Sequence, residues 1–201
     1  MLSEGDARAP VGLRERKKAK TRAAIRQHAL RLFQTQGYEA TTVEQIAEAA
    51  EISPSTFFRY FLTKEAVVLT DEYDPLIVAA FKAQPAELGP ITALRRAFHQ
   101  VFAALSAEQL AQERERQALI LSVAELRAGA LDGLAQTVQL LAEVVAERVG
   151  RRPNELAVRS FAGAVIGVGL AAMLTAAEDP TADIFALLDA AMAHLEAGLP
   201  L

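Results

Sequence analysis

Residues 41–65 constrain the fold more than any other stretch, because they combine two short amphipathic helices with a tight turn. Thr41 and Thr42 each have a glutamate or glutamine three residues later, which is capping-box spacing, so a helix is expected to begin at one of them. A turn follows, and Ser53 and Pro54 suit the N-cap and the first position of a second helix. The apolar residues of the first helix recur at helical spacing, at Val43, Ile46, Ala47 and Ala50.

The second helix, residues 54–61, divides into an apolar and a polar side on a helical wheel. Its apolar side consists of Phe57, Phe58 and Phe61, which we expect to be buried. The polar side then projects hydroxyl groups and a guanidinium that can bond base edges and phosphates: Ser55, Thr56, Arg59 and Tyr60. So short a helix fits the recognition helix of a helix-turn-helix. Thr63 is expected to cap the next helix, where Lys64 would add a phosphate contact.

A basic segment precedes this region. Between Arg8 and Arg31 the chain holds nine basic residues and one acid, whereas residues 66–201 hold ten basic and seventeen acidic residues. This asymmetry suits a protein that touches DNA with its N-terminal end only. Residues 1–13 are expected to be a disordered arm, and the helix that follows should extend past the core as a cationic segment. Its expected DNA contacts are Arg14, Lys17, Lys18 and Arg22.

The chain closely resembles the TetR (tetracycline-repressor) family of bacterial transcriptional regulators. The matching residues are Phe33, Gly37, Tyr38, Thr41–Val43, Ile46, Ala47, Ala50, Ile52, Ser53, Thr56–Phe61, Lys64 and Glu65. The resemblance implies a DNA-binding head, a ligand and dimerisation domain, and repression relieved by a small molecule. It also implies DNA contacts at Thr42, Ser53, Pro54, Ser55, Thr56, Arg59, Tyr60 and Lys64. Two positions depart from the family: Glu51 replaces a usual glycine, and Phe58 replaces a tyrosine that often bonds phosphate.

The remainder, residues 66–201, is expected to be all-helical, so the fold class is all-α with a three-helix head at residues 14–65. No strand alternation occurs there, and Pro and Gly residues separate the segments. Pro75 should kink the first helix, either as a hinge between head and ligand domain or as a passive bend. Asp179 and Pro180 should begin the last helix. The expected helices span residues 64–83, 90–105, 107–123, 125–149, 154–177 and 180–198.

Residues 160–177 carry no charge and approach the length of a membrane span. We interpret them as a soluble helix with one side on its own domain and the other on a second copy, because the small residues Gly163, Gly167 and Ala171 allow close approach. This predicts a homodimer through residues 154–177 and 180–198, as in the resembling family, which would bind a palindromic operator.

The effector site is expected among the middle helices, with ordinary core packing as the alternative for each residue. Relatives in the resembling family that respond to acyl-CoA-like or other hydrophobic compounds give a weak indication of the effector. The candidates are Phe81, Phe98, His99, Phe102, Leu119, Ser122, Arg127 and Met173.

Other classes of protein fit the sequence less well than a DNA-binding regulator. The chain has no cysteine, its three histidines lack metal-ligand spacing, and it has no phosphate loop or nucleophile elbow, so we expect neither an enzyme nor a cofactor or metal. Without a secretory signal, a cytoplasmic location is expected. The remaining alternative is a helical protein-interaction module with a vestigial helix-turn-helix.

Overall fold

The computed structural model describes residues 12–179 and 182–200, and every regular element in these ranges is a helix, which confirms the all-α fold class. The chain forms two compact units that divide between Val68 and Leu69. The expected disordered arm lies almost wholly outside the described residues.

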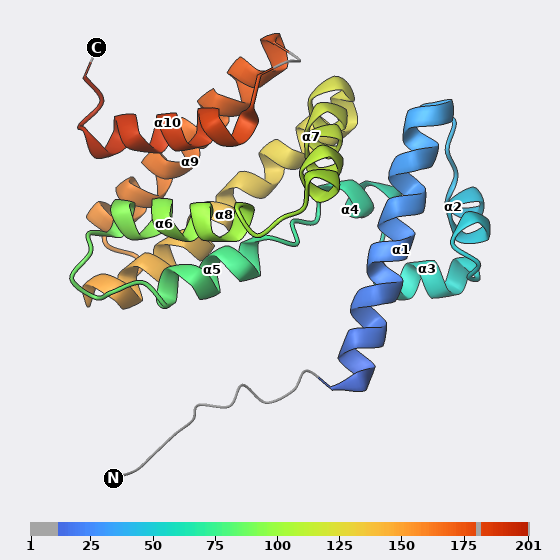
Figure 1. Cartoon of the computed structure of the whole chain (residues 1–201), viewed down its shortest axis with the longest axis horizontal. Coiled ribbons are helices and arrows are strands. Elements are labelled where there is room, and N and C mark those ends of the chain that lie inside the picture. The colour runs from blue at the N-terminus through green and yellow to red at the C-terminus, as the bar shows by residue number, and fades with distance from the viewer. Residues whose placement is uncertain (1–11, 180–181, 201) are drawn as a thin grey trace. The chain divides into compact units, whose positions relative to one another are not determined.

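The first unit contains α1 (Leu13–Gln36), α2 (Val43–Ala49) and α3 (Pro54–Tyr60), and α4 (Lys64–Leu69) runs to its end (Figure 1). Both α1 and α3 contact α2. The buried positions of α1 are spaced four residues apart, so they form one stripe that meets the buried faces of the shorter helices. The core consists of Ile25, Ala29, Leu30, Phe33, Tyr38, Ile46, Ala47, Phe57, Phe61, Val67 and Val68.

Thr42 rather than Thr41 begins α2. The Thr42 hydroxyl accepts from the Gln45 N–H, and the Gln45 side chain accepts from the Thr42 N–H at 2.9 Å, which completes a capping box. Thr41 is buried, and its hydroxyl donates to the Gly37 carbonyl at 2.7 Å. Thr42 therefore caps α2, and Thr41 stabilises the loop before it.

The turn between α2 and α3 forms on a non-glycine residue. Glu51 has φ +54°, in the left-handed region. Its N–H donates to the Glu48 carbonyl, and the Ile52 N–H donates to the Ala47 carbonyl at 2.9 Å. These two bonds define a Schellman motif, whose left-handed position is usually glycine. Ser53 then caps α3 as expected, accepting from the Thr56 N–H at 3.1 Å.

The second unit is a helical bundle in which α9 packs against α8 and α10, and α6 packs against α5 and α10 (Figure 1). Its core gathers apolar residues from five of these helices around Phe81, Leu94, Ala142, Val145 and Ala162. The helices are α5 (Asp74–Lys82), α6 (Pro90–Phe102), α7 (Ala107–Ser122), α8 (Ala124–Val149), α9 (Leu156–Glu178) and α10 (Ile184–Glu196).

The prediction of one kinked helix over residues 64–83 is wrong, because the chain forms two helices, α4 and α5, with a break at residues 70–73. Pro75 lies in the first turn of α5, where its missing N–H costs no hydrogen bond. The Asp71 carboxylate caps this helix by accepting from the N–H of Tyr73 at 2.7 Å and of Asp74 at 3.4 Å.

The expected start of the last helix is also wrong. Asp183 caps α10, accepting from the N–H of Phe185 at 3.0 Å, whereas Asp179 follows the last residue of α9. Pro180 lies outside the described residues.

Candidate DNA interface and effector cavity

Two of the three phenylalanines of α3 are buried as expected, but Phe58 is not. Phe57 and Phe61 are 0% and 2% exposed, whereas Phe58 is 48% exposed. Phe57 and Phe61 are four residues apart and therefore share a face, while Phe58 is rotated by a further 100° toward solvent. The polar side of α3 therefore includes one exposed aromatic ring.

The polar side of α3 begins with three hydroxyl groups in one hydrogen-bonded cluster. Ser53 Oγ lies 2.9 Å from Ser55 Oγ and 3.0 Å from Thr56 Oγ1. Arg59 is exposed, with its guanidinium 5.6 Å from the Tyr60 ring centroid. Pro54 and Thr42 are also exposed, although the Thr42 hydroxyl serves the α2 cap. The structure thus gathers hydroxyl groups and a cation on the outer side of α3.

Arg22 supports α3 from within the unit. Its Nη1 donates to the Tyr60 carbonyl at 3.2 Å, and its guanidinium lies 4.4 Å from the Phe61 ring centroid. A cation is stabilising at the carbonyl end of a helix. Arg22 therefore fixes the C-terminal end of α3, a role that its sequence pattern did not indicate. Its expected contact with DNA stays a prediction.

Lys64 also has an internal role. Its Nζ donates to the carbonyls of Tyr38 at 3.0 Å and Thr41 at 3.2 Å, and lies 4.1 Å from the Tyr38 ring centroid. The Tyr38 hydroxyl in turn donates to Glu65. Lys64 thus ties α4 to the loop before α2. Thr63 caps α4 as expected, accepting from the Ala66 N–H at 3.1 Å.

The N-terminal part of α1 is cationic and exposed. Arg14, Lys17 and Lys18 are all exposed on it, and the buried stripe of α1 begins only at Ile25. Three exposed cations on one helical segment favour contact with phosphates. This arrangement agrees with the cationic extension predicted from the sequence.

The second unit encloses a cavity of about 500 Å³. Four of the sequence candidates line it: Phe98, Phe102, Arg127 and Met173. The sequence analysis missed Tyr73 and Phe185, which continue the aromatic wall, with ring centroids 5.5 and 4.3 Å from Phe102. Most of the remaining lining is aliphatic, from Ile77, Leu94, Ile120, Leu134, Val165, Ile166, Leu170, Leu174, Leu188 and Met192.

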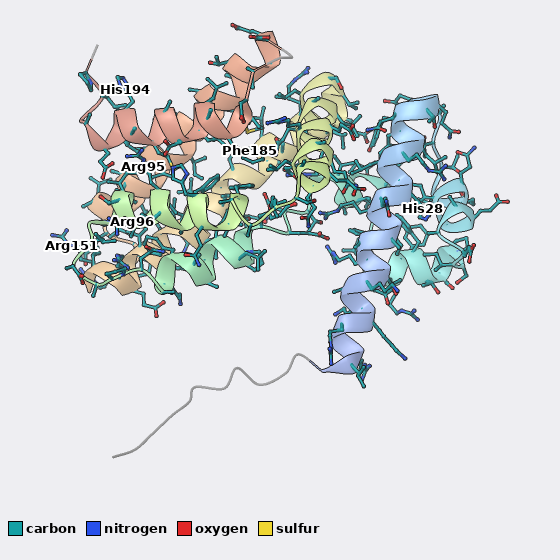
Figure 2. All side chains as sticks on the ribbon, viewed as in Figure 1. His28, Arg95, Arg96, Arg151, Phe185 and His194 are labelled. Atoms are coloured by element: carbon teal, nitrogen blue, oxygen red, sulfur yellow. The ribbon has the colours of Figure 1, made fainter. Side chains whose placement is uncertain are left out.

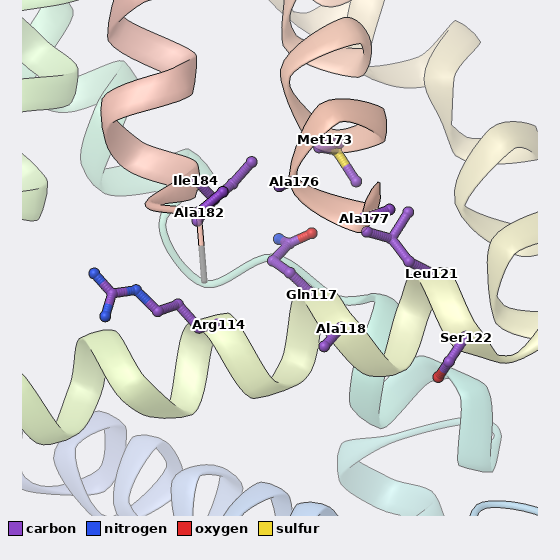
Figure 3. Close-up of a pocket in the computed structure, with 10 residues that line it drawn as sticks. All are labelled: Arg114, Gln117, Ala118, Leu121, Ser122, Met173, Ala176, Ala177, Ala182 and Ile184. Carbon is purple, nitrogen blue, oxygen red and sulfur yellow. The ribbon is translucent and has the colours of Figure 1, made fainter. Parts of the chain in front are cut away.

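A second chamber of about 270 Å³ adjoins the first, because Gln117, Leu121, Met173 and Ile184 line both. Ser122 lines only this smaller chamber, and its hydroxyl donates to the Leu119 carbonyl. Figure 3 shows Gln117 extending from α7 into the space bounded by Met173 and Ile184.

Three further sequence candidates line neither chamber. His99 is wrong as a cavity residue: it is exposed on α6, with Nε2 2.9 Å from the Asp189 carboxylate. Its neighbour Arg95 donates to Asp189 and Glu196 of α10, on the same outer surface (Figure 2). Phe81 belongs to the closed core, and Leu119 is only partly buried.

One end of the larger cavity is polar and acid-rich. Glu113 and Arg116 are buried there and joined by two hydrogen bonds, of 2.9 and 2.5 Å. Arg116 Nη2 also lies 3.8 Å from the Asp71 carboxylate. Burial, together with the nearby Asp71, raises the pKa of Asp74, and Arg116 opposes this shift. Burial and the Glu113 charge likewise raise the pKa of Tyr73.

The expected dimer surface on α9 is uncovered within this chain. A Cβ atom placed on Gly163 or Gly167 would meet nothing within 4 Å, and Ala171 is exposed. The helix is long and apolar enough to cross a membrane, with mean hydropathy 1.8, yet only 17% of its most apolar window is buried. An apolar helix left open on one side needs a further partner.

Two family matches cover most of the chain. Residues 25–70 match the family described as bacterial regulatory proteins, tetR family, and residues 88–200 match the MftR C-terminal domain. The two matches leave out the N-terminal part of α1 and residues 71–87, which include all of α5.

Individual relatives are also transcriptional regulators. TcmR from Streptomyces glaucescens is 50% identical over 92 residues, which are 45% of this chain and 41% of that protein. MftR from Mycobacterium tuberculosis, a regulator named for mycofactocin biosynthesis, is 27% identical over 92% of this chain and 93% of its own. Among solved structures, Thermus thermophilus FadR in complex with lauroyl-CoA is 25% identical, with a TM-score of 0.54 over 90% of this chain and 95% of that one.

Proposed function

Because the chain belongs to the TetR family of bacterial transcriptional regulators, we propose that it is a homodimeric repressor that leaves a palindromic operator when a small molecule fills its cavity. The observation that supports this most is α3: two buried phenylalanines hold it so that Ser55, Thr56 and Arg59 face outward. The cytoplasm is the compartment where such a protein meets DNA.

In this proposal α3 enters the major groove with its N-terminal end. Ser55, Thr56 and Arg59 contact base edges, because hydroxyls and guanidinium groups are the donors and acceptors that read them. The exposed cations Arg14, Lys17 and Lys18 contact phosphates. Thr42, Ser53, Pro54 and Tyr60 line the remainder of the contact surface, and Arg22 and Lys64 contribute mainly by holding α3 and the α1–α2 loop in place.

The test uses a duplex that the protein itself selects from a randomised pool. Arg59→Ala should reduce affinity for that duplex by about ten- to hundredfold and relax selectivity at one base step, since a base contact is worth about 1–3 kcal/mol. Arg96→Ala is the matched control, because Arg96 is exposed on α6 (Figure 2). Unchanged affinity and selectivity in Arg59→Ala would contradict the proposed orientation of α3.

The same selection separates regulation from protein interaction. A repressor should enrich one palindromic sequence, and its binding should survive competitor DNA while weakening steeply with salt. A helix-turn-helix that had become a protein-interaction module would enrich no sequence.

Dimerisation is proposed through α9 and α10, with Gly163, Gly167 and Ala171 at the contact. Gly167→Arg should leave the monomer folded, because a side chain there meets nothing within 4 Å, but should prevent a second helix from approaching. Light scattering should then give a monomer for Gly167→Arg and a dimer for the control Ala135→Arg on exposed α8 surface. A protein that instead partitions into membranes would refute this use of α9.

A further inference from the structure

The larger cavity has the size and lining of a binding site for a ring-bearing molecule. Its volume of about 500 Å³ lies in the range of sites that hold drug-sized ligands. Phe102 stands between Phe98 and Phe185, with ring centroids 4.7 and 4.3 Å away. Such a wall favours a flat apolar body, and its ring faces also attract cations.

Gln117 lines this cavity and carries an unpaired buried acceptor. Its Nε2 donates to Glu113 Oε1 at 2.9 Å. A carboxylate only accepts, so this contact fixes which end of the amide faces Glu113 and leaves Gln117 Oε1 on the other side. That oxygen is buried and accepts no hydrogen bond among the described residues. An unpaired buried acceptor of this kind is costly.

Asp74 presents a second acceptor on the same wall. Its side chain lines the cavity and is partly buried, yet its carboxylate makes no hydrogen bond or ion pair within residues 12–179 and 182–200. Asp71 links it to Arg116 and Glu113, and Gln117 bonds to Glu113. The two unpaired acceptors therefore belong to one continuous polar cluster.

The charges around the cavity favour a cation over an anion. Its lining includes three carboxylates, Asp71, Asp74 and Glu113, and one guanidinium, Arg127. Arg127 donates to the Leu121 carbonyl at 2.7 Å, and Arg116 is held by Glu113. Glu113 neutralises Arg116, which leaves the two carboxylates Asp71 and Asp74 against the single guanidinium of Arg127, so the net charge favours a cation.

We propose that the effector is a lipophilic amine, with its rings against Phe98, Phe102 and Phe185 and its protonated nitrogen at the Asp74 carboxylate. This rests on the proposed function, because it names the chemistry of the molecule that the effector cavity takes. It also replaces the acyl-CoA-like effector expected from family resemblance with a compound of opposite charge.

The test compares three probes that share one ring system and differ in one group: 2-(1-naphthyl)ethylamine, 2-(1-naphthyl)ethanol and 1-naphthylacetate. Calorimetry on the full chain without DNA measures each affinity. The amine should bind about ten- to hundredfold more tightly than the acetate, with the alcohol between them, since a charge-assisted hydrogen bond is the main difference.

Asp74→Asn should remove most of the preference for the amine and leave the affinity for the alcohol unchanged. Asp132→Asn, an exposed site on α8, is the matched control and should keep the preference. A thermal unfolding scan of each variant confirms that it is folded. Equal or tighter binding of the acetate, an unaltered preference in Asp74→Asn, or no measurable binding of any probe at millimolar concentration would overturn the proposal. Because no DNA is present, this outcome is independent of whether the protein binds an operator.

Discussion

Glu51 holds a backbone conformation that favours glycine, so replacing it should stabilise the protein. Its φ of +54° places Cβ close to the following carbonyl oxygen, which costs about 1–2 kcal/mol in an L-residue. Glycine removes that strain but loses about 0.5–1 kcal/mol through its freer unfolded state. Glu51→Gly should therefore raise the free energy of unfolding by about 0.5–1 kcal/mol.

Glu51 is exposed beside the proposed DNA surface, so its negative charge could affect DNA binding as well as stability. Three variants distinguish the effect of backbone strain from the effect of this charge. Glu51→Gly removes both, Glu51→Asn removes the charge and tolerates the left-handed region, and Glu51→Gln removes the charge alone. Stability can be measured by urea unfolding, with the circular dichroism of the helices as the signal. Glu51→Gly should be the most stable variant and Glu51→Asn the next, whereas Glu51→Gln should be about as stable as the parent chain. Affinity for the selected duplex should instead rise similarly in all three, because each loses one negative charge near phosphates.

Two results of these measurements would contradict the prediction. If Glu51→Gln gains as much stability as Glu51→Gly, the benefit comes from charge and the left-handed turn carries no measurable strain. If Glu51→Gly is less stable than the parent chain, the Schellman turn depends on the glutamate side chain, and the reasoning from φ is wrong.

Four other substitutions have outcomes set by the contacts and exposures described above. Phe58→Tyr should raise operator affinity about tenfold in anisotropy titrations without steepening the salt dependence, because it adds a neutral donor at an exposed position of α3; unchanged affinity would place residue 58 away from the phosphates. Lys64→Ala should lower the free energy of unfolding by about 1–3 kcal/mol, since it removes two hydrogen bonds and a cation–π contact. The exposed Lys17→Ala should instead leave stability unchanged, weaken DNA binding and reduce its salt slope. Asp74→Asn should stabilise the protein at pH 7: burial raises the folded-state pKa of Asp74, so the folded chain binds the proton more tightly and stability falls as pH rises through that pKa. The advantage of the variant should shrink as pH falls to about 4, and an advantage independent of pH would contradict this cause.

The DNA-binding half could be predicted from the sequence because its signals are local. A capping box, Ser53 before Pro54, and phenylalanines four residues apart each act over a single turn of helix. The expected burial of Phe58 was wrong because its position on α3 turns it toward solvent, and the internal roles of two cations in this half were missed because they depend on long-range contacts. The internal bonds of Arg22 and Lys64 join residues 38 and 26 positions apart, and no spacing rule connects such pairs.

Proline at position 75 was misassigned for a related reason. Proline suits the first turn of a helix as well as it disrupts the middle, so its meaning depends on where the helix begins. The decisive signal was Asp71, whose carboxylate caps α5 and thereby ends the continuity with α4. An aspartate three or four residues before a proline could have located this boundary.

The effector cavity could not be predicted from the sequence. Its aromatic wall comes from Tyr73 just before α5, from the end of α6 and from the start of α10, and Phe185 lies more than eighty residues from Phe102 along the chain. Phe98 and Phe102 were among the sequence candidates and lie four residues apart on one helix, whereas Phe185 joins them only through folding. The sequence gives a weaker signal for the acid-rich end of the cavity. Glu113, Arg116 and the buried Ile120 are separated by three and four residues, so they share one face of α7. Charged residues on a buried stripe require internal partners, and here those partners set the charge of the cavity. Effector chemistry in a protein of this kind is therefore better inferred from polar groups that the helices bury than from the family to which the chain belongs.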